Sequence, residues 1–206
     1  QGDDQGLVLP PRLAPLQVVF IPIFKGKEGH GEILEYIEKI GASLDGEISY
    51  RLDAREEYTP GWKFNEWEQA GVPIRIEAGP RDLQRGVVVA VRRDTGEKMD
   101  LGQDKVKEKV RELLDEIQAS LYRQALQFRQ ENTTTVDDYE TFKEIVADPG
   151  GFIYAHWCGD SECEDQIKEE TMATVRCIPL ESESDGGGCV RCGKESGERA
   201  YFAKAY

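Results

Sequence analysis

The 206-residue chain lacks the sequence features that mark membrane spans and the common catalytic motifs. No apolar run approaches the roughly 20 residues needed to cross a bilayer, which excludes a spanning helix. There is no glycine-rich phosphate loop, no dinucleotide-binding fingerprint and no Gly-x-Ser-x-Gly elbow. The only two histidines, His30 and His156, have no triad-like neighbours. We therefore expect no catalytic residue in this chain.

Positive charge is scarce. The chain has 26 lysines and arginines against 40 aspartates and glutamates, a net charge of −14. Non-specific binding to nucleic acid requires a basic surface that displaces counterions, so this balance argues against it. Local recognition by a few well-placed groups stays open. The chain also lacks an initiator methionine and opens on Gln1-Gly2-Asp3-Asp4, which predicts a piece of a longer protein.

Five cysteines are too few for a disulfide scaffold, but four of them form two close pairs. Cys158 and Cys163 are separated by four residues, and Cys189 and Cys192 by two, with Gly193 next to allow a tight turn. Such pairs can converge on one Zn²⁺ with sulfur ligands about 2.3 Å from the ion. The alternative is two disulfides in a secreted protein, but no signal peptide opens the chain. The spacing favours zinc, in a structural role, because four thiolates leave no open position for water.

Two other residues lie close to these pairs in the sequence. Cys177 has no near partner, so we expect a buried small hydrophobe rather than a nucleophile. His156 precedes Cys158 and is an alternative ligand, although a structural role is the commoner one for such a histidine.

Periodicity predicts a compact α/β unit in the first two thirds of the chain. Apolar or β-branched runs predict strands at residues 7–9, 17–24, 47–52, 72–78 and 86–92. Helical spacing predicts helices at residues 32–44, 62–70 and about 104–131, with a turn at 79–82. This order is typical of a mixed sheet flanked by helices.

A second, smaller α+β unit is predicted after residue 135. A helix capped by Asp137 or Asp138 runs through Val146. The remaining predicted elements are strands at 152–157, 173–179 and 199–206 and a helix at 164–171. The unit is small for its core, so we expect it to need a metal ion to hold its shape.

Unusual side chains are also concentrated between residues 59 and 82. Trp62, Phe64 and Trp67 stand among charged residues of a short predicted helix, and Arg75 and the Arg81-Asp82 pair follow. An unstacked RNA base requires such a set, with a ring to stack on and polar groups for its edge. For guanine, one carboxylate can accept both Watson–Crick N–H groups, and O6 and N7 suit a guanidinium fork. The alternative, which composition by itself favours, is core aromatics with a solvated charged rim.

Together these segments resemble the C-terminal part of prolyl-tRNA synthetase, a class II aminoacyl-tRNA synthetase, of the kind that has a C-terminal zinc-binding domain. Residues 2–23 resemble the tail of the family's motif 3, its last catalytic-domain strand and the hinge, and residues 59–83 resemble its anticodon-reading segment. The zinc module and C-terminal end are matched by residues 157–164, 171–181, 188–193 and 202–206.

The resemblance implies roles for individual residues. Proline codons begin with two cytosines, so every proline anticodon ends in two guanines. Phe64 would stack on a base, and the charged residues would bond guanine edges or the adjacent backbone: Glu68, Arg75, Arg81 and Asp82. Arg81 stands where relatives often carry lysine, so a cation is kept but the contact geometry differs.

The resemblance also implies domains and partners. The catalytic domain would end within residues 1–15, the anticodon-binding domain would span 16–132, and the zinc-binding domain 133–206. The zinc ligands would be Cys158, Cys163, Cys189 and Cys192. The Tyr206 carboxylate would turn toward the catalytic domain.

The remaining expectations concern the whole enzyme. The full-length enzyme would use ATP and Mg²⁺ to ligate proline to tRNA(Pro) through prolyl-adenylate, as a homodimer in the cytoplasm without membrane contact. Two other functions stay open: a free-standing accessory protein without RNA specificity, and a zinc-dependent hydrolase, which four thiolate ligands disfavour.

Overall fold

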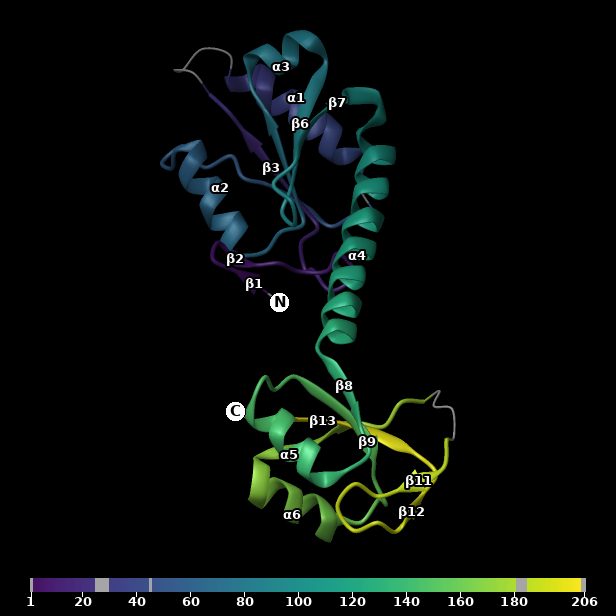
Figure 1. Ribbon diagram of the computed structural model, residues 1–206. Coiled ribbons are helices and arrows are strands. Elements are labelled where there is room, and N and C mark those ends of the chain that lie inside the picture. The colour runs from purple at the N-terminus through teal and green to yellow at the C-terminus, as the bar shows by residue number, and fades with distance from the viewer. Residues whose placement is uncertain (1, 25–29, 45, 181–184, 205–206) are drawn as a thin grey trace. The chain divides into compact units, whose positions relative to one another are not determined.

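The computed structural model describes residues 2–24, 30–44, 46–180 and 185–204, which form two compact units (Figure 1). Unit 1 comprises Gln1–Arg123 and unit 2 comprises Gln124–Tyr206. The division falls inside a long helix, whereas the predicted domain boundary at 132/133 lies beyond that helix and stays a prediction. None of the described helices combines the length and the apolar character that crossing a membrane requires.

Unit 1 is built on a five-stranded mixed sheet, as the sequence predicts. The strand order is β4-β3-β5-β6-β7; β3 pairs in parallel with both β4 and β5, and the other two pairings are antiparallel. The strands are β3 (Val18–Pro22), β4 (Tyr50–Leu52), β5 (Ile74–Ala78), β6 (Val87–Arg92) and β7 (Lys98–Gly102). The last of these was missing from the sequence prediction. Its polar, half-exposed residues lack the apolar run by which a buried strand is detected.

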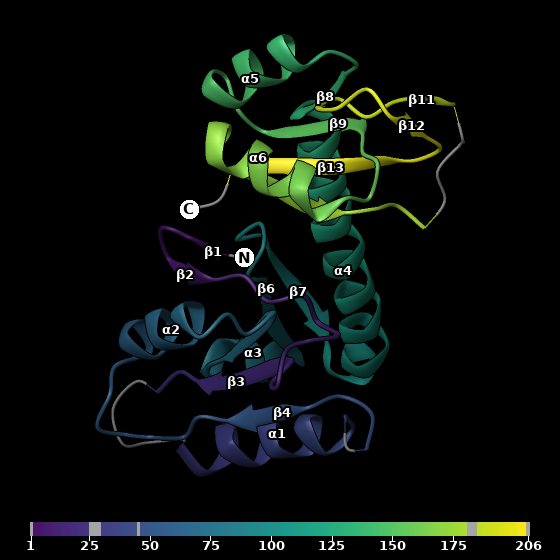
Figure 2. The same cartoon turned by 90° about the horizontal axis from the view of Figure 1, so that it is seen from below.

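Helices cover both faces of this sheet because its inner strand β3 is apolar on both sides. Val18 and Phe20 of β3 join the larger core, which α1 (His30–Ala42) and α4 (Val106–Glu131) close. Val19 and Ile21 point to the other face and meet the side chains of α2 (Pro60–Gln69). Figures 1 and 2 show α2 and α4 on opposite sides of the sheet. The helices flanking the sheet confirm the predicted α/β class.

Local signals set the ends of α2. The Thr59 hydroxyl accepts a hydrogen bond from the Trp62 N–H at 3.3 Å, and Pro60 occupies the first turn, where its missing N–H costs nothing. Past the C-terminal end, Gly71 adopts φ +74°, a left-handed conformation that favours glycine.

The predicted turn at residues 79–82 is wrong in one respect. Pro80–Arg85 form a short helix, α3, whose first turn is closed by the Gly79 N–H donating to Asp82 Oδ2 at 2.9 Å. Proline at the first helical position and an aspartate two residues later are helix-start signals as well as turn signals, so the sequence alone does not separate the two.

A small hairpin opens unit 1. Its strands β1 (Gly2–Asp3) and β2 (Gly6–Leu7) pair with each other and lie against the C-terminal end of α2. The bidentate ion pair between Arg93 and Asp3 joins the hairpin to the end of β6, while the same guanidinium donates to the Glu68 carbonyl at 3.0 Å.

Unit 2 is a four-stranded sheet with the order β10-β13-β9-β8, in which only β8 and β9 run parallel. Its elements are β8 (Thr133–Val136), α5 (Tyr139–Ala147), β9 (Phe152–His156), α6 (Ser161–Thr171), β10 (Ala173–Cys177), the ribbon β11 (Gly187–Gly188) and β12 (Glu195–Ser196), and β13 (Arg199–Lys204). Asp138 caps α5 by accepting from the Thr141 N–H at 2.9 Å, one of the two predicted caps. The threonine run at 133–135, which the sequence predicts to be a boundary between the units, belongs to β8.

We predict that Gly71→Ala destabilises unit 1 more than Gly96→Ala. Both glycines have nearly the same positive φ, +74° and +71°, so both alanines are strained by about 1 kcal/mol. A Cβ on Gly71 would also lie 2.9 Å from the Leu7 carbonyl oxygen, whereas the space around Gly96 is open. Urea unfolding should show a further loss of about 1–3 kcal/mol for the first variant. Equal losses would contradict the packing of the hairpin on α2.

Candidate nucleic-acid interface and cysteine cluster

Three of the five predicted base-binding residues lie together where one flank of α2, with Phe64 and Glu68, faces Arg75 of β5. The Arg75 guanidinium carbon is 4.2 Å from the centroid of the Phe64 ring, and Arg75 Nη1 is 2.5 Å from Glu68 Oε1. On its other side Arg75 Nε donates to Glu77 Oε1 at 2.9 Å. Arg75 is buried, whereas the Glu68 side chain is 31% exposed. The buried arginine therefore holds the partly exposed Glu68 carboxylate and the Phe64 ring in place from the side of the sheet.

The other two predicted residues lie apart from this group. Arg81 and Asp82 belong to the first turn of α3, which follows the far end of β5. Arg81 is exposed, and Asp82 caps its own helix through one oxygen. Among the residues that the structure describes, no hydrogen bond or ion pair joins either of them to the Phe64 flank.

The alternative of core aromatics is partly confirmed. Phe64 and Trp67 pack against the small apolar cluster of Val19, Ile21 and Val72 between α2 and the sheet. Trp62 instead remains 45% exposed. Phe64 thus has a core contact and a guanidinium contact at the same time.

A buried charge cluster centred on Asp53 was missed by the sequence analysis. The Asp53 carboxylate accepts from Arg55 Nε and Nη2 at 2.8 and 2.7 Å and from Trp67 Nε1 at 2.8 Å. The Lys63 ammonium donates to the Asp53 carbonyl oxygen at 3.0 Å, and Arg55 also pairs with Glu66. One feature of the sequence could have indicated this cluster. Lys63 stands four residues before Trp67 and so shares one face of the predicted helix with that aromatic ring.

These partners control the ionisation of Asp53. Burial disfavours its charged form, but the hydrogen bonds from Arg55 and Trp67 and the nearby Lys63 ammonium more than offset that effect. The pKa of Asp53 is consequently lowered to about 2. The carboxylate stays charged over the physiological pH range and holds its three partners together.

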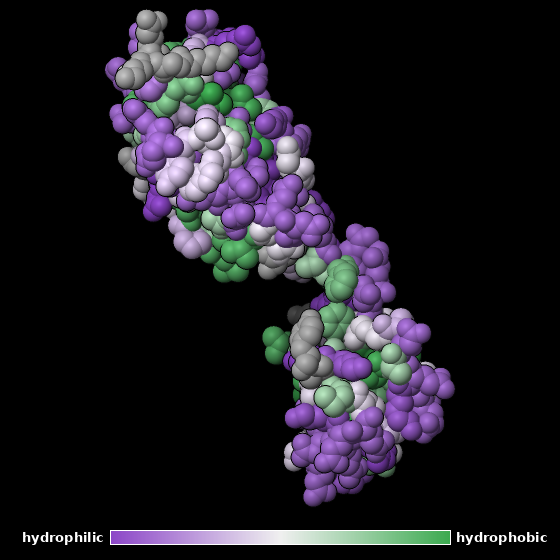
Figure 3. Space-filling model, turned by 90° about the vertical axis from the view of Figure 1, so that its left-hand side faces the viewer, coloured by the Kyte–Doolittle hydropathy of each residue, from purple (hydrophilic) through white to green (hydrophobic). Residues whose placement is uncertain are grey.

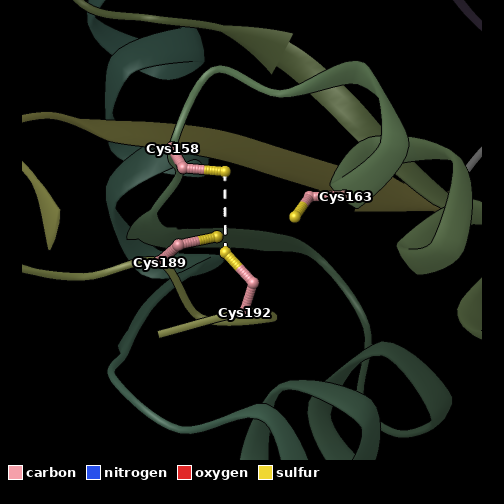
Figure 4. A group of neighbouring side chains, drawn as sticks. All are labelled: Cys158, Cys163, Cys189 and Cys192. Atoms are coloured by element: carbon pink, nitrogen blue, oxygen red, sulfur yellow. Dashed lines mark hydrogen bonds between the residues drawn. The ribbon is translucent and has the colours of Figure 1, made fainter. Parts of the chain in front are cut away.

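The four paired cysteines of unit 2 converge as predicted (Figure 4). Their sulfur atoms all lie within 4.8 Å of one another, and the Cys158 and Cys192 sulfurs are 3.8 Å apart. A tetrahedron with 2.3 Å arms has edges of about 3.8 Å, so the donor set fits a tetrahedral metal ion. All five cysteines of the chain are free thiols, which contradicts the disulfide alternative.

Two tight loops bring these thiols together. Cys158 is followed by Gly159 at φ +78°, and Cys163 comes from the first turn of α6. Gly193, at φ +71°, closes the second loop by donating its N–H to the Cys189 carbonyl at 2.8 Å. The predicted role of this glycine is confirmed.

The thiols differ in their ionisation. Burial raises the pKa of Cys158 and Cys163, while a backbone hydrogen bond from Lys194 lowers the pKa of Cys192 to about 7. Buried thiols of this kind are held as thiolates when a cation supplies the compensating charge.

One expectation about a neighbouring residue is wrong. Cys177 is exposed, not buried, because it lies at the end of edge strand β10, beyond the core. His156 agrees with the structural role rather than the alternative of a ligand, because it lies buried outside the cysteine group with Nε2 3.1 Å from Asp185 Oδ1. Tyr206, for which a contact with the catalytic domain is predicted, lies outside the described residues.

Comparisons with known proteins agree with this geometry. Residues 17–113 match the family model of the anticodon-binding domain, and residues 139–206 match that of the C-terminal domain of prolyl-tRNA synthetase. The proline–tRNA ligases of Cytophaga hutchinsonii and Porphyromonas gingivalis are 47% and 48% identical to the chain over 206 residues. The alignments cover all of this chain and 42% of each ligase.

A solved structure gives the same result. The prolyl-tRNA synthetase of Cryptosporidium parvum, crystallised with L-proline and AMP, superimposes with a TM-score of 0.85 at 34% identity. The match covers the whole of this chain and 43% of that one. The fold and the matches define the chain as the anticodon-binding and C-terminal domains of a class II aminoacyl-tRNA synthetase. It belongs to the prolyl-tRNA synthetase family and spans less than half the length of the relatives it matches.

We predict that Asp53 makes the stability of unit 1 sensitive to acid. The folded pKa of about 2 lies below the ordinary 3.8, so the stabilisation of about 2 kcal/mol is present above pH 5 and is lost as the pH falls toward 2. Asp53→Asn should remove this part of the acid dependence in urea titrations between pH 5 and 2. Glu38→Gln, at an exposed position of α1, should leave it unchanged. An unaltered pH profile in the asparagine variant would count against the cluster.

Proposed function

We propose that this chain is the tRNA-recognising and zinc-bearing portion of an enzyme that ligates proline to tRNA(Pro). The observation that carries the proposal is the half-exposed Glu68 carboxylate, held by Arg75 beside the Phe64 ring. The activation of proline with ATP and Mg²⁺ belongs to a catalytic domain outside this chain. We propose the domains 1–15, 16–132 and 133–206, and a homodimeric, cytoplasmic full-length enzyme without membrane contact.

In the proposed complex Glu68 reads a guanine edge. A carboxylate accepts both N1–H and N2–H of guanine, and no other base presents two adjacent donors in that way. Phe64 offers a ring on which an unstacked base packs. Because Arg75 is buried between two glutamates, we assign it to positioning Glu68 rather than to reaching far into solvent.

Arg81 and Asp82 serve the second guanine or the adjacent backbone in this proposal. Arg81 is exposed and has no ion pair among the described residues, so its guanidinium is available to a phosphate or to guanine O6 and N7. Asp82 uses one oxygen for its helix cap, which leaves the other for an N–H donor of the RNA.

We predict that Glu68→Gln weakens binding of proline tRNA by roughly 1–3 kcal/mol, because the amide accepts only one of the two guanine N–H groups at the same position. The measurement is tRNA affinity by gel shift at fixed salt. Arg75→Ala is a poorer test because it leaves the buried Glu77 carboxylate with only Lys98, 4.0 Å away, and so destabilises the fold.

The control for this experiment is the RNA itself. Each of the two anticodon guanines is replaced in turn by adenosine, and both proteins are measured on every RNA. Wild type should bind more weakly to the RNA in which the guanine read by Glu68 is replaced. Glu68→Gln should bind that RNA and the unaltered RNA with nearly the same affinity. Equal affinity of both proteins for all the RNAs would favour a free-standing accessory protein instead.

We also propose that the cysteine cluster holds one structural Zn²⁺. The four sulfurs supply the donor number and spacing that tetrahedral zinc takes, and they leave no position for a reactive water. The ion would join the loop after β9, the first turn of α6 and the second cysteine loop. It would stabilise unit 2 but take no part in chemistry.

We predict that one thiol reacts quickly with a thiol reagent in the zinc-loaded protein and that all five react after chelation. The fast thiol is Cys177, which lies exposed outside the cluster. Cys189→Ser should abolish zinc binding by X-ray fluorescence and lower the unfolding temperature of unit 2, whereas Cys177→Ser should keep one zinc per chain. Rapid reaction of four or more thiols with zinc still bound would rule out the site.

A further inference from the structure

The flank of α2 that faces β4, opposite Phe64, carries an exposed pair of stacked aromatic rings. Tyr58 and Trp62 lie face to face, with ring centroids 4.0 Å apart and planes inclined by 13°. Both are substantially exposed, at 38% and 45%. The Arg55 guanidinium carbon lies 4.9 Å from the Tyr58 centroid and 5.4 Å from that of Trp62.

The buried charge cluster holds this pair in a defined position. Arg55 is bonded to the carboxylates of Asp53 and Glu66, so its guanidinium plane has little freedom. The cap of Thr59 on the Trp62 N–H fixes the start of the helix between the two rings. A rigid exposed ring loses little conformational entropy when a ligand stacks on it.

The hollows and charges around the Tyr58–Trp62 pair indicate which part of a ligand this flank recognises. Arg55 lines two hollows, one of about 290 Å³ that includes Tyr58 and one of about 320 Å³ toward β4. Glu56 and Glu57 lie next to the rings and are exposed, which disfavours a phosphate there. Figure 3, which faces the α2 side of the molecule, shows pale residues of intermediate hydropathy among strongly hydrophilic ones. The flank thus suits a flat, uncharged group.

The geometry points to a second base-stacking platform, made by Tyr58, Trp62 and Arg55, for one unpaired nucleobase beside the guanine pair. This inference rests on the proposed tRNA recognition. An α-helix with its side chains is about 10–12 Å across, so the two flanks of α2 lie within reach of nucleotides in one RNA loop. Stacking tolerates any base, because every base has a π-face. The platform therefore adds affinity without changing the preference for guanine.

The test uses the whole chain and a fluorescein-labelled RNA hairpin with a seven-nucleotide loop that contains the two guanines. Trp62→Ala should weaken binding by about 5- to 150-fold in fluorescence anisotropy. Trp62→Phe, which keeps a π-face, should retain most of the affinity. Tyr122→Ala removes an aromatic ring that is 66% exposed elsewhere in unit 1 and should bind like wild type.

An abasic scan of the other five loop positions identifies the stacked nucleotide. Removal of the base at one position outside the guanines should weaken binding by wild type. Removal of the same base should leave binding by Trp62→Ala unchanged. Because the ring is uncharged, the dependence of affinity on salt should be the same in both proteins.

The outcomes separate this inference from the proposed function. If Trp62→Ala binds every hairpin within twofold of wild type while guanine discrimination persists, the platform is no RNA site and only this inference falls. If Trp62-dependent binding persists without guanine discrimination, the platform stands and the anticodon proposal falls. If wild type does not bind the hairpin at all, both are overturned.

Discussion

The buried Asp53 carboxylate is the constraint on which the arrangement of α2 depends. Asp53 is only 3% exposed, and a buried charge is stable only when it is paired and hydrogen-bonded. Here the Arg55 guanidinium and the Trp67 indole donate hydrogen bonds to the carboxylate, and the Lys63 ammonium lies nearby. Two of these partners, Lys63 and Trp67, belong to the inward side of α2. The cluster therefore sets the rotation of the helix about its own axis, and with it the direction of both flanks.

A second buried ionic group, centred on Arg75, fixes α2 against β5. Arg75 bridges Glu77 of its own strand and Glu68 of α2, with its guanidinium carbon 4.2 Å from the Phe64 centroid. Most of the cationic groups near α2 are thus already neutralised by carboxylates. This accounts for how a chain of net charge −14 can serve the proposed recognition of RNA. In the proposed complex, stacking and edge hydrogen bonds would supply most of the contacts, and the exposed Arg81 would be available to a phosphate.

Unit 2 meets a different physical problem, because its core is small. Phe142, Phe202 and Ile153 are among the largest fully buried side chains of this unit, and the cysteine group lies where the loops leave the sheet. Among the described residues, these loops contribute Val190 to that core and Trp157 to its edge. A divalent ion on four thiolates would replace the missing apolar burial with coordinate bonds.

Some of this could be predicted because the signals are local. The spacings of Cys158 with Cys163 and of Cys189 with Cys192 bring each pair together through one short loop. The apolar run of β3 predicts a strand buried on both faces, and Thr59-Pro60 predicts a helix start, from neighbouring residues alone. The short helix α3 was not predicted because its local signals also fit a turn, and the polar strand β7 was not predicted because it lacks an apolar run.

The partners of Asp53 and Arg75 could not be predicted, nor could the separation of Arg81 and Asp82 from the Phe64 flank. Neighbouring residues are enough to indicate the order of most elements, the convergence of the cysteine pairs and the concentration of aromatic and charged groups between residues 59 and 82. Which of these charges are buried and which rings stay exposed follows from the folded chain alone. That choice depends on which strand lies beside α2, and strand neighbours such as β3 and β5 are far apart in the chain.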